Sequence, residues 1–267
     1  MNPRRLAAIA LRQFYLFRGS FARVIPLFAW VAIDMVLWGF MTRYLNVVAG
    51  SRYRFVPALL GAVLFWDFMS RVLQGVTTAF FEDVWARNFL NVFASPITTA
   101  EYIGGLLVCS MGASAVGLVV MVLVAGLAFG LSFAAYGAML VPFLLVLFLF
   151  GLALGILGSA IVLRLGPASE WFVWPIPALL APFAAVYYPL ATLPAWMRAF
   201  SRLIPASYVF EGMRAIVAGR PFDTTLFAAA LALAAAYVLL AYWLFARVFR
   251  YAVRTGLIAR YSAETVS

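Results

Sequence analysis

The sequence predicts an all-α membrane protein with six transmembrane helices. Of its 267 residues, 67% are hydrophobic and only 10% are charged, which is more apolar surface than a water-soluble domain of this length can bury. The apolar residues also gather in runs of about 20, the length that an α-helix needs to cross a bilayer. Short polar segments separate these runs, so the chain is expected to cross the membrane repeatedly.

The six apolar runs set the expected crossings, which together form one transmembrane domain over 24–267. They cover residues 24–44, 55–79, 102–129, 142–162, 171–188 and 226–249. An even number of crossings puts both termini on the same side. The arginines at the two ends and in the loops on their side outnumber those on the opposite side, which predicts cytoplasmic termini. The expected location is the cytoplasmic membrane.

Residues 1–23 are expected to form an amphipathic helix at the cytoplasmic face. On a helical projection, Arg5, Arg12 and Arg23 fall on one side, and Phe14, Phe17 and Phe21 fall on the other. Such a helix can lie in the headgroup layer before the first crossing. A positive flank that only orients the first crossing is the open alternative.

A polar stretch at about 80–95 separates the second and third crossings and predicts a short surface helix. Glu82 and Asp83 suit a helix N-terminus, Arg87 follows Asp83 by four residues, and the Ser95-Pro96 pair supplies a stop. We expect this helix to lie at the cytoplasmic membrane face, where its polar residues are available to a partner.

Three local patterns describe the spans themselves. Thr98 and Glu101 have capping-box spacing at the start of the third span. In the fourth span, Gly151 and Gly155 repeat every four residues together with a serine, which predicts close helix packing. Pro182 lies in the middle of the fifth span and predicts a kink there.

The segment at about 189–220 is too polar to span a membrane and too apolar for a simple loop. Pro194 suits a first helical turn and Pro205 breaks the run, which predicts two short helices. Glu211 and Arg214 can pair at i,i+3 on the second helix. We interpret the segment as a re-entrant helical hairpin on the outer side. An amphipathic surface loop remains the alternative.

Three charged residues fall within predicted spans, where burial of a charge is costly and functional roles are common. Asp67 and Arg71 share one face of the second span at i,i+4. At about 1.5 Å per residue, Asp34 of the first span has a similar depth. The three are therefore expected to form a cluster, with either a structural role in neutralising buried charge or a role in the substrate path.

Residue types that are missing exclude several function classes. The chain has no His, no Lys and a single cysteine, Cys109, inside an apolar run. Ordinary metal sites and a Ser-His triad are thereby excluded, as is the lysine of a P-loop. We expect no metal, no cofactor in this chain and no enzymatic activity of its own. The arginines flank apolar runs, which favours lipid headgroups over nucleic acid as partners.

Two segments carry a resemblance to a known family. The loop ending FASPITTAEYIGG and the segment YYPLATLPAWMRAFSRLIPASYVFEGMRAIVAG, together with the basic N-terminus and six spans, resemble the membrane-spanning permease subunit of type-2 ABC exporters. The second segment is the more specific. The chain has Ile204 before Pro205, where many relatives have Asn.

The resemblance implies a dimer of this chain with two copies of a separate ATPase subunit, which would hold the ATP and magnesium. It implies that the stretch at 80–95 contains a coupling helix that docks on the ATPase. The polar and aromatic contacts would be Glu82, Asp83, Trp85, Arg87 and Asn88. The expected substrate is an amphipathic lipid, lipo-oligosaccharide or drug-like molecule.

Three alternatives stay open at this point. The first is a permease that exports a polysaccharide. The second is an ion-coupled secondary transporter or channel, which the charges inside the spans would favour. The third is an enzyme embedded in the membrane, which would need a catalytic constellation that the sequence does not offer.

Overall fold

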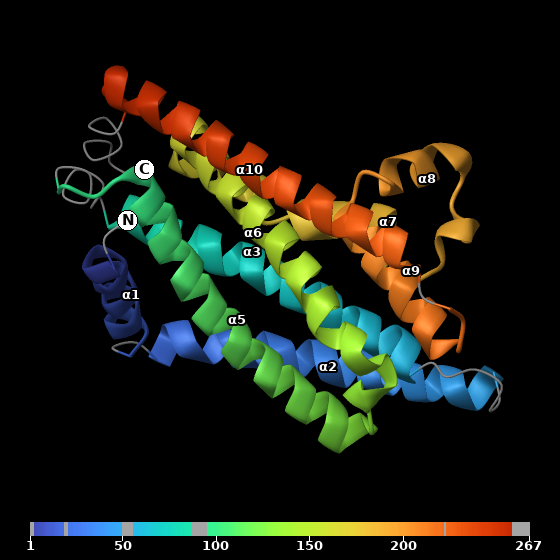
Figure 1. Cartoon of the computed structure of the whole chain (residues 1–267). Coiled ribbons are helices and arrows are strands. Elements are labelled where there is room, and N and C mark those ends of the chain that lie inside the picture. Colours follow the sequence, from blue (N-terminus) through green and yellow to red (C-terminus); the bar gives the residue numbers. More distant parts are fainter. Residues whose placement is uncertain (1–2, 19–20, 50–55, 87–94, 222, 258–267) are drawn as a thin grey trace.

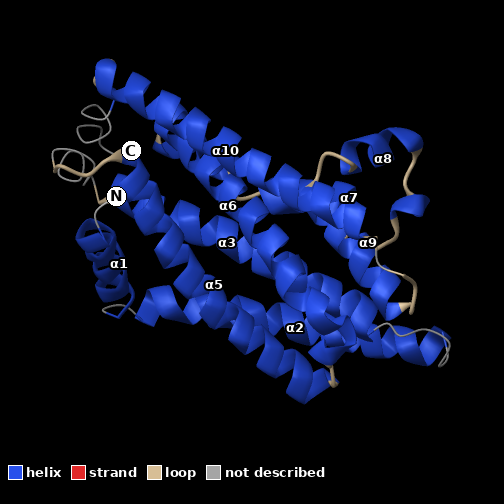
Figure 2. Ribbon diagram, viewed as in Figure 1, coloured by secondary structure: helices blue, strands red, loops and turns tan. Residues whose placement is uncertain are grey.

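The structure is a computed structural model that describes residues 3–18, 21–49, 56–86, 95–221 and 223–257. These residues form helices and loops and contain no strand (Figure 2). The long helices are α1 (Pro3–Arg18), α2 (Phe21–Ala49), α3 (Gly61–Trp85), α5 (Thr99–Phe129), α6 (Leu140–Leu165) and α10 (Thr224–Arg254). The short elements are η1 (Val56–Leu60), η2 (Phe133–Met139), η3 (Pro167–Phe172), α7 (Ile176–Ala184), η4 (Leu190–Thr192), α8 (Ala195–Ser201) and α9 (Pro205–Val217). The all-α class is confirmed for this part of the chain.

Four helical segments in the described residues are long and apolar enough to cross a membrane. They are Ala58–Trp85, Thr99–Phe129, Phe133–Leu165 and Thr224–Arg254. These segments contain most of the second predicted span and all of the third, fourth and sixth. The first predicted span lies within α2, which is 29 residues long. The chain is thus a multi-pass helical protein, while the complete six-span layout stays a prediction.

The fifth predicted span, 171–188, is wrong as one continuous helix. α7 has nine residues, and Ala185 after it has a left-handed backbone with φ 54°. At about 1.5 Å per residue, α7 alone covers less than half of a bilayer core. Prolines account for the short helix: Pro177 lies in its first turn, where proline is tolerated, and Pro182 lies in its interior, where it removes a backbone donor.

The broken segment nevertheless runs along the length of α3. At one end, Trp85 in the last turn of α3 donates a hydrogen bond to Glu170 in η3, over 3.0 Å. At the other end, Arg214 in α9 donates to the carbonyl of Val186, over 3.4 Å, and α9 packs against η1 before the start of α3. A pair of short pieces therefore occupies the place of the expected fifth helix.

The expected start of a surface helix at residue 80 is also wrong. α3 continues without interruption to Trp85, and Phe80, Phe81 and Asp83 are buried within it. The apolar residues of this turn pack into the bundle, because Phe80 contacts the rings of Tyr102 and Phe245. Arg87 and Asn88 lie outside the described residues, so the rest of the expected surface helix is not tested.

The core of the bundle lies around α3, between α5 and α6 (Figure 1). α6 approaches α3 closely where it carries glycines: a Cβ atom at Gly151 would lie 2.5 Å from the carbonyl oxygen of Met69. At Gly155 it would lie 2.7 Å from the Val76 Cβ atom. The predicted close packing at these glycines is confirmed. α10 then covers α6 from the other side with its buried alanines.

Elements gather at two ends of the bundle. α1, the end of α3, the start of α5 and the ends of α6 and α10 lie at one end, on the left in Figure 1. The short helices α8 and α9 lie at the opposite end. This division places the described start of the predicted coupling stretch, in the last turns of α3, and the predicted hairpin at opposite ends of the molecule.

Candidate functional site: a polar junction beneath α1

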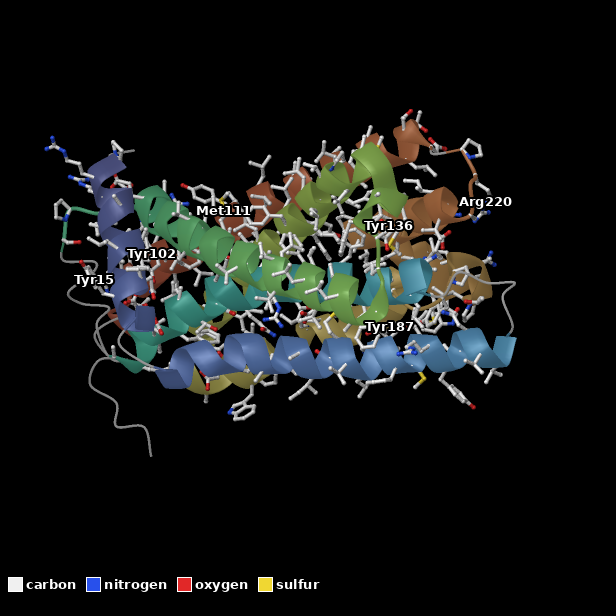
Figure 3. The ribbon with its side chains drawn as sticks, turned by 90° about the horizontal axis from the view of Figure 1, so that it is seen from below. Tyr15, Tyr102, Met111, Tyr136, Tyr187 and Arg220 are labelled. Carbon is white, nitrogen blue, oxygen red and sulfur yellow. The ribbon has the colours of Figure 1, made fainter. Side chains whose placement is uncertain are left out.

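The end of α3 and the start of α5 are joined by side chains of α1. Arg12 of α1 forms an ion pair with Asp83 of α3. The hydroxyl of Tyr102, in the first turn of α5, donates to the other carboxylate oxygen of Asp83 over 2.8 Å. Asp83 and Tyr102 are each 1% exposed. Figure 3 shows Tyr102 close to α1. One buried carboxylate thus connects three helices.

A second ion pair ties α1 to the N-terminus of α5. Thr98 and Glu101 form the predicted capping box, in which each side chain accepts a hydrogen bond from the backbone of the other residue. The same Glu101 carboxylate accepts a hydrogen bond from Arg5 of α1, over 3.1 Å. Because Glu101 is 3% exposed, this charge is satisfied within the protein.

Neutral contacts bring α1 close enough for these pairs to form. Ile9 is buried against Gly105 of α5, where a Cβ atom would lie 2.5 Å from the Ile9 side chain. Gln13 donates to the carbonyl of Ala79 over 3.3 Å. We refer to the contacts of Arg5, Ile9, Arg12 and Gln13 with the ends of α3 and α5 as the α1 junction.

Opposite charges stabilise the α1 junction. Burial alone would lower the pKa of the Arg12 guanidinium, but the hydrogen bond and charge of Asp83 more than offset this, so the pKa of Arg12 is raised. Arg12 therefore stays charged at any physiological pH. Because the ion pair links Asp83 to Arg12, a displacement of this end of α3 should also displace α1.

The five residues predicted to contact an ATPase have different positions. Glu82 and Asp83 are buried, at 8% and 1% exposure, and Asp83 faces α1. Trp85 is 52% exposed. Arg87 and Asn88 lie outside the described residues. The ATPase contacts of all five stay predictions, and among the described three only Trp85 offers a surface in this arrangement.

The predicted charge cluster forms between α2 and α3. Arg71 donates to Asp67 over 2.9 Å, as the i,i+4 spacing predicts. Asp34 of α2 interacts with Arg71 through its charge. Gly117 of α5 leaves room for the cluster, because a Cβ atom there would lie 3.0 Å from the Arg71 Cδ atom. The structure brings the three residues together, while their role stays a prediction.

A pair of aromatic rings lies beside these charges. Trp38 of α2 stacks on Tyr187, with 5.0 Å between ring centroids and 8° between planes. Tyr187 belongs to the segment that follows α7 and interacts electrostatically with Asp34 and Asp67. Figure 3 labels Tyr187. This stacking connects the broken fifth segment to α2.

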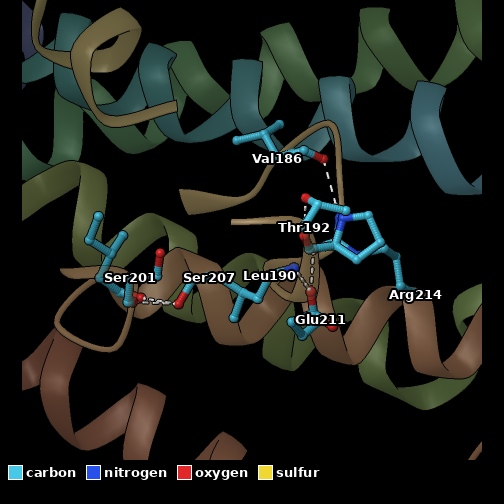
Figure 4. A network of polar contacts seen from close by, with 9 residues as sticks. Val186, Leu190, Thr192, Ser201, Ser207, Glu211 and Arg214 are labelled. Atoms are coloured by element: carbon cyan, nitrogen blue, oxygen red, sulfur yellow. Dashed lines mark hydrogen bonds and ion pairs between the residues drawn. The ribbon is translucent and has the colours of Figure 1, made fainter. Parts of the chain in front are cut away.

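The two helices predicted for 189–220 are present as α8 and α9. Pro194 is the N-cap of α8 and Pro205 occupies the first turn of α9. Glu211 accepts from Arg214 over 3.0 Å, as predicted, and also from the backbone N–H of Leu190 over 2.7 Å (Figure 4). Glu211 and Arg214 thereby hold the loop after α7 against α9. The outer, re-entrant position of this hairpin stays a prediction.

Comparison with known families identifies the protein class. The sequence profile of the family described as ABC-2 type transporter matches residues 6–218, which is well over half of the chain. This chain belongs to the ABC-2 type transporter family. No curated protein matches it. Membership in the family supports the predicted permease and multi-pass membrane character.

The membrane subunits of ABC-2 transporters are non-catalytic, and a separate ABC ATPase subunit hydrolyses ATP. Membership therefore implies that this chain associates with such an ATPase. Among the residues that the structure describes, no group of three or more His, Cys, Asp or Glu is placed to hold a metal ion.

Several residues of this ABC-2 permease site could not be found from the sequence. The sequence did not predict the roles of Tyr102, Gln13 and Glu170. Each forms a hydrogen bond with a residue far away in the sequence, and no motif surrounds it. One signal did exist: Arg5 and Arg12 fall on one face of a helix that carries no acidic residue. Such a face requires partners elsewhere, either lipid headgroups or carboxylates of the protein.

Proposed function

We propose that this chain is the permease subunit of an ATP-driven exporter in the cytoplasmic membrane. It moves an amphipathic lipid, lipo-oligosaccharide or drug-like molecule, and a separate ATPase supplies the energy. The ABC-2 family match supports the transport class, and the absence of a P-loop lysine from the sequence supports the separate ATPase. The resemblance to the permease subunit of type-2 ABC exporters supports export as the direction of transport.

The α1 junction is the observation that carries the mechanical part of this proposal. It joins α1 to the last turn of α3 and the first turn of α5 through buried ion pairs at Asp83 and Glu101. The last turn of α3 lies within the stretch at 80–95, and the first turn of α5 follows this stretch. A force applied to that stretch would therefore move α1, α3 and α5 together, because separating the helices would leave the buried carboxylates of Asp83 and Glu101 without their charge partners.

Docking of the ATPase is assigned to this end of the bundle. Trp85, Arg87 and Asn88 are the proposed direct contacts, and the buried Asp83 transmits the displacement to α1. Since ATP is hydrolysed in the cytoplasm, this end and both termini face the cytoplasm in the proposal. The α8 and α9 hairpin, at the opposite end of the bundle, then faces outward.

The functional unit in this proposal is a dimer of the permease with two ATPase subunits. Large apolar side chains on α2 are exposed in the single chain, including Leu37, Phe40 and Tyr44. Some of this surface faces lipid, and some is available to a second copy. The charges of Asp34, Asp67 and Arg71 lie beside it and are proposed to border the substrate path.

Reconstitution of the permease with its co-expressed ATPase tests the proposal. Trp85→Ala should weaken ATPase binding about tenfold or more, because truncation of an interface tryptophan commonly costs about 1–2 kcal/mol or more. Trp196→Ala, on the exposed α8 at the opposite end, is the matched control and should leave binding unchanged. Equal affinity of the ATPase for the wild type and Trp85→Ala would contradict docking at this end.

The substrate class needs a second measurement in the same vesicles. ATPase activity should rise with an amphipathic lipid, lipo-oligosaccharide or drug from a panel and should not respond to long polysaccharides. Stimulation by polysaccharide alone would favour the polysaccharide exporter instead. Transport without ATP, driven by an ion gradient, would favour a secondary transporter.

A further inference from the structure

The end of α10 carries a stripe of arginines and aromatic residues on its surface. Trp243, Arg247, Arg250 and Arg254 recur every three or four residues, so they lie on one face of the helix. All four are exposed, Trp243 at 49%. Neither α10 nor α6, which packs beside it, contains an acidic residue. This face therefore presents positive charge without an acid on either helix.

A fourth guanidinium joins this stripe from α6. Arg164, in the last turn of α6, lies 4.1 Å above the centre of the Tyr251 ring. Arg247 lies 5.3 Å from the Trp243 ring centre in the same way. Within the described residues, none of these arginines forms an ion pair. A guanidinium that stacks on a ring is held in place while its N–H groups stay available to an anion.

A narrow cavity opens between the same two helices, further into the membrane-length part of the bundle. It has a volume of about 110 Å³ and is lined by Leu154 and Leu157 of α6, by Leu240, Ala241 and Leu244 of α10, and by neighbouring apolar side chains. Leu157 and Leu244 each lie two turns or less before the arginine on their own helix. The cavity is thus an apolar slot that leads away from the arginines.

The arginine stripe and the apolar slot match the charged end and the apolar end of one amphipathic molecule. Several guanidiniums at the membrane boundary fit a phosphate headgroup, because they donate paired hydrogen bonds and juxtamembrane arginines attract anionic lipids. A slot without polar groups fits an acyl chain, since burial there costs no hydrogen bonds. α6 and α10 run side by side along this whole length (Figure 1).

We propose that α6 and α10 form a binding site for an anionic phospholipid. The headgroup phosphate binds Arg164, Arg247 and Arg250, and one acyl chain enters the slot beside Leu240 and Leu244. The lipid comes from the leaflet at the end of the bundle that carries the α1 junction. It is a resident membrane lipid, distinct from the transported substrate, so the site does not depend on the proposed transport reaction.

Native mass spectrometry of the full chain, purified in a mild detergent with cardiolipin, phosphatidylglycerol or phosphatidylcholine, tests the site. Arg164→Gln combined with Arg247→Gln should lower retention of the two anionic lipids by about fivefold for each arginine removed. Arg198→Gln with Arg202→Gln removes the same charge from the exposed α8 region at the opposite end and should change nothing. Equal losses in both double variants would overturn the site, because the effect would then follow net charge alone.

A second variant tests the slot without touching the charges. Leu240 is 49% exposed, so Leu240→Trp can fill the slot without disturbing the core. It should lower retention of long-chain anionic lipid while the protein keeps its thermal midpoint. Inorganic phosphate should not displace the bound lipid. Displacement by millimolar phosphate, or unchanged retention in Leu240→Trp, would show that the acyl chain is not bound and would overturn the assignment.

Discussion

The Asp83 carboxylate links α3 to both α1 and α5. Arg12 and Tyr102 both bind it, from positions 71 residues before and 19 residues after it in the sequence. The sequence could show that Asp83 lies in a polar stretch, but not that a helix from the N-terminus covers it. The Asp67 and Arg71 pair, in contrast, was predictable because its two members are one helical turn apart.

A double-mutant cycle measures the coupling of Arg12 with Asp83. Arg12→Gln and Asp83→Asn should each destabilise the purified chain, and the double variant should lose less than the sum of both. The expected coupling energy is about 1–3 kcal/mol, since contacting charged residues commonly couple by this amount. Thermal or denaturant unfolding in detergent gives the value. Arg198→Gln paired with Asp83→Asn is the control and should be additive, and additivity in the Arg12 cycle would contradict the pair.

The two aspartates of the charge cluster should respond differently to replacement. Asp67 is hydrogen-bonded to Arg71, whereas Asp34 interacts only through its charge. Asp67→Asn should therefore reduce the folded yield and stability by about 3–5 kcal/mol, the cost of breaking a buried ion pair. Asp34→Asn should leave the folded yield close to normal and lower transport. A loss of yield in Asp34→Asn with unchanged transport per folded molecule would remove Asp34 from the substrate path.

At the scale of the helices, the close contact of α6 with α3 depends on glycines in α6, which have no side chain. At Gly151 a methyl group would meet backbone, which cannot rotate away. Gly151→Ala should therefore destabilise the protein by about 1–3 kcal/mol through overpacking. Gly112→Ala is the matched control, because nothing lies within 4 Å of the added atom. Melting of the two variants in the same detergent gives the comparison, and equal midpoints would contradict the close packing.

Helix positions were predictable from apolar runs, while helix continuity was not. The capping box at Thr98 and the prolines before α8 and α9 are local signals, and all three mark helix starts in the structure. Two predictions were wrong because each rested on a single property of a local stretch of sequence. The acidic residues Glu82 and Asp83 suggested a helix start, but Asp83 pairs with Arg12 of α1 and α3 continues to Trp85. The span over 171–188 was judged by its hydropathy, although its prolines limit α7 to nine residues.

Over the whole molecule, the two ends of the bundle have different chemistry. One end carries the α1 junction and the arginines of α10, and the other carries the α8 and α9 hairpin. The arginine distribution in the sequence predicts this polarity, because charge counts do not require knowledge of packing. How α1 folds back onto α3 and α5 could not be predicted, since amphipathicity alone does not choose between lipid and protein as the partner of a helix face.

The central claim is that the end with the α1 junction receives the ATPase. A photo-crosslinking amino acid placed at Trp85 or at Trp196, in cells that co-express the ATPase, tests it most directly. Both positions are exposed, at 52% and 62%, and they lie at opposite ends of the bundle. Crosslinks to the ATPase are expected from position 85 and none from position 196. Crosslinks from position 196 alone would place the ATPase at the hairpin end and contradict the account.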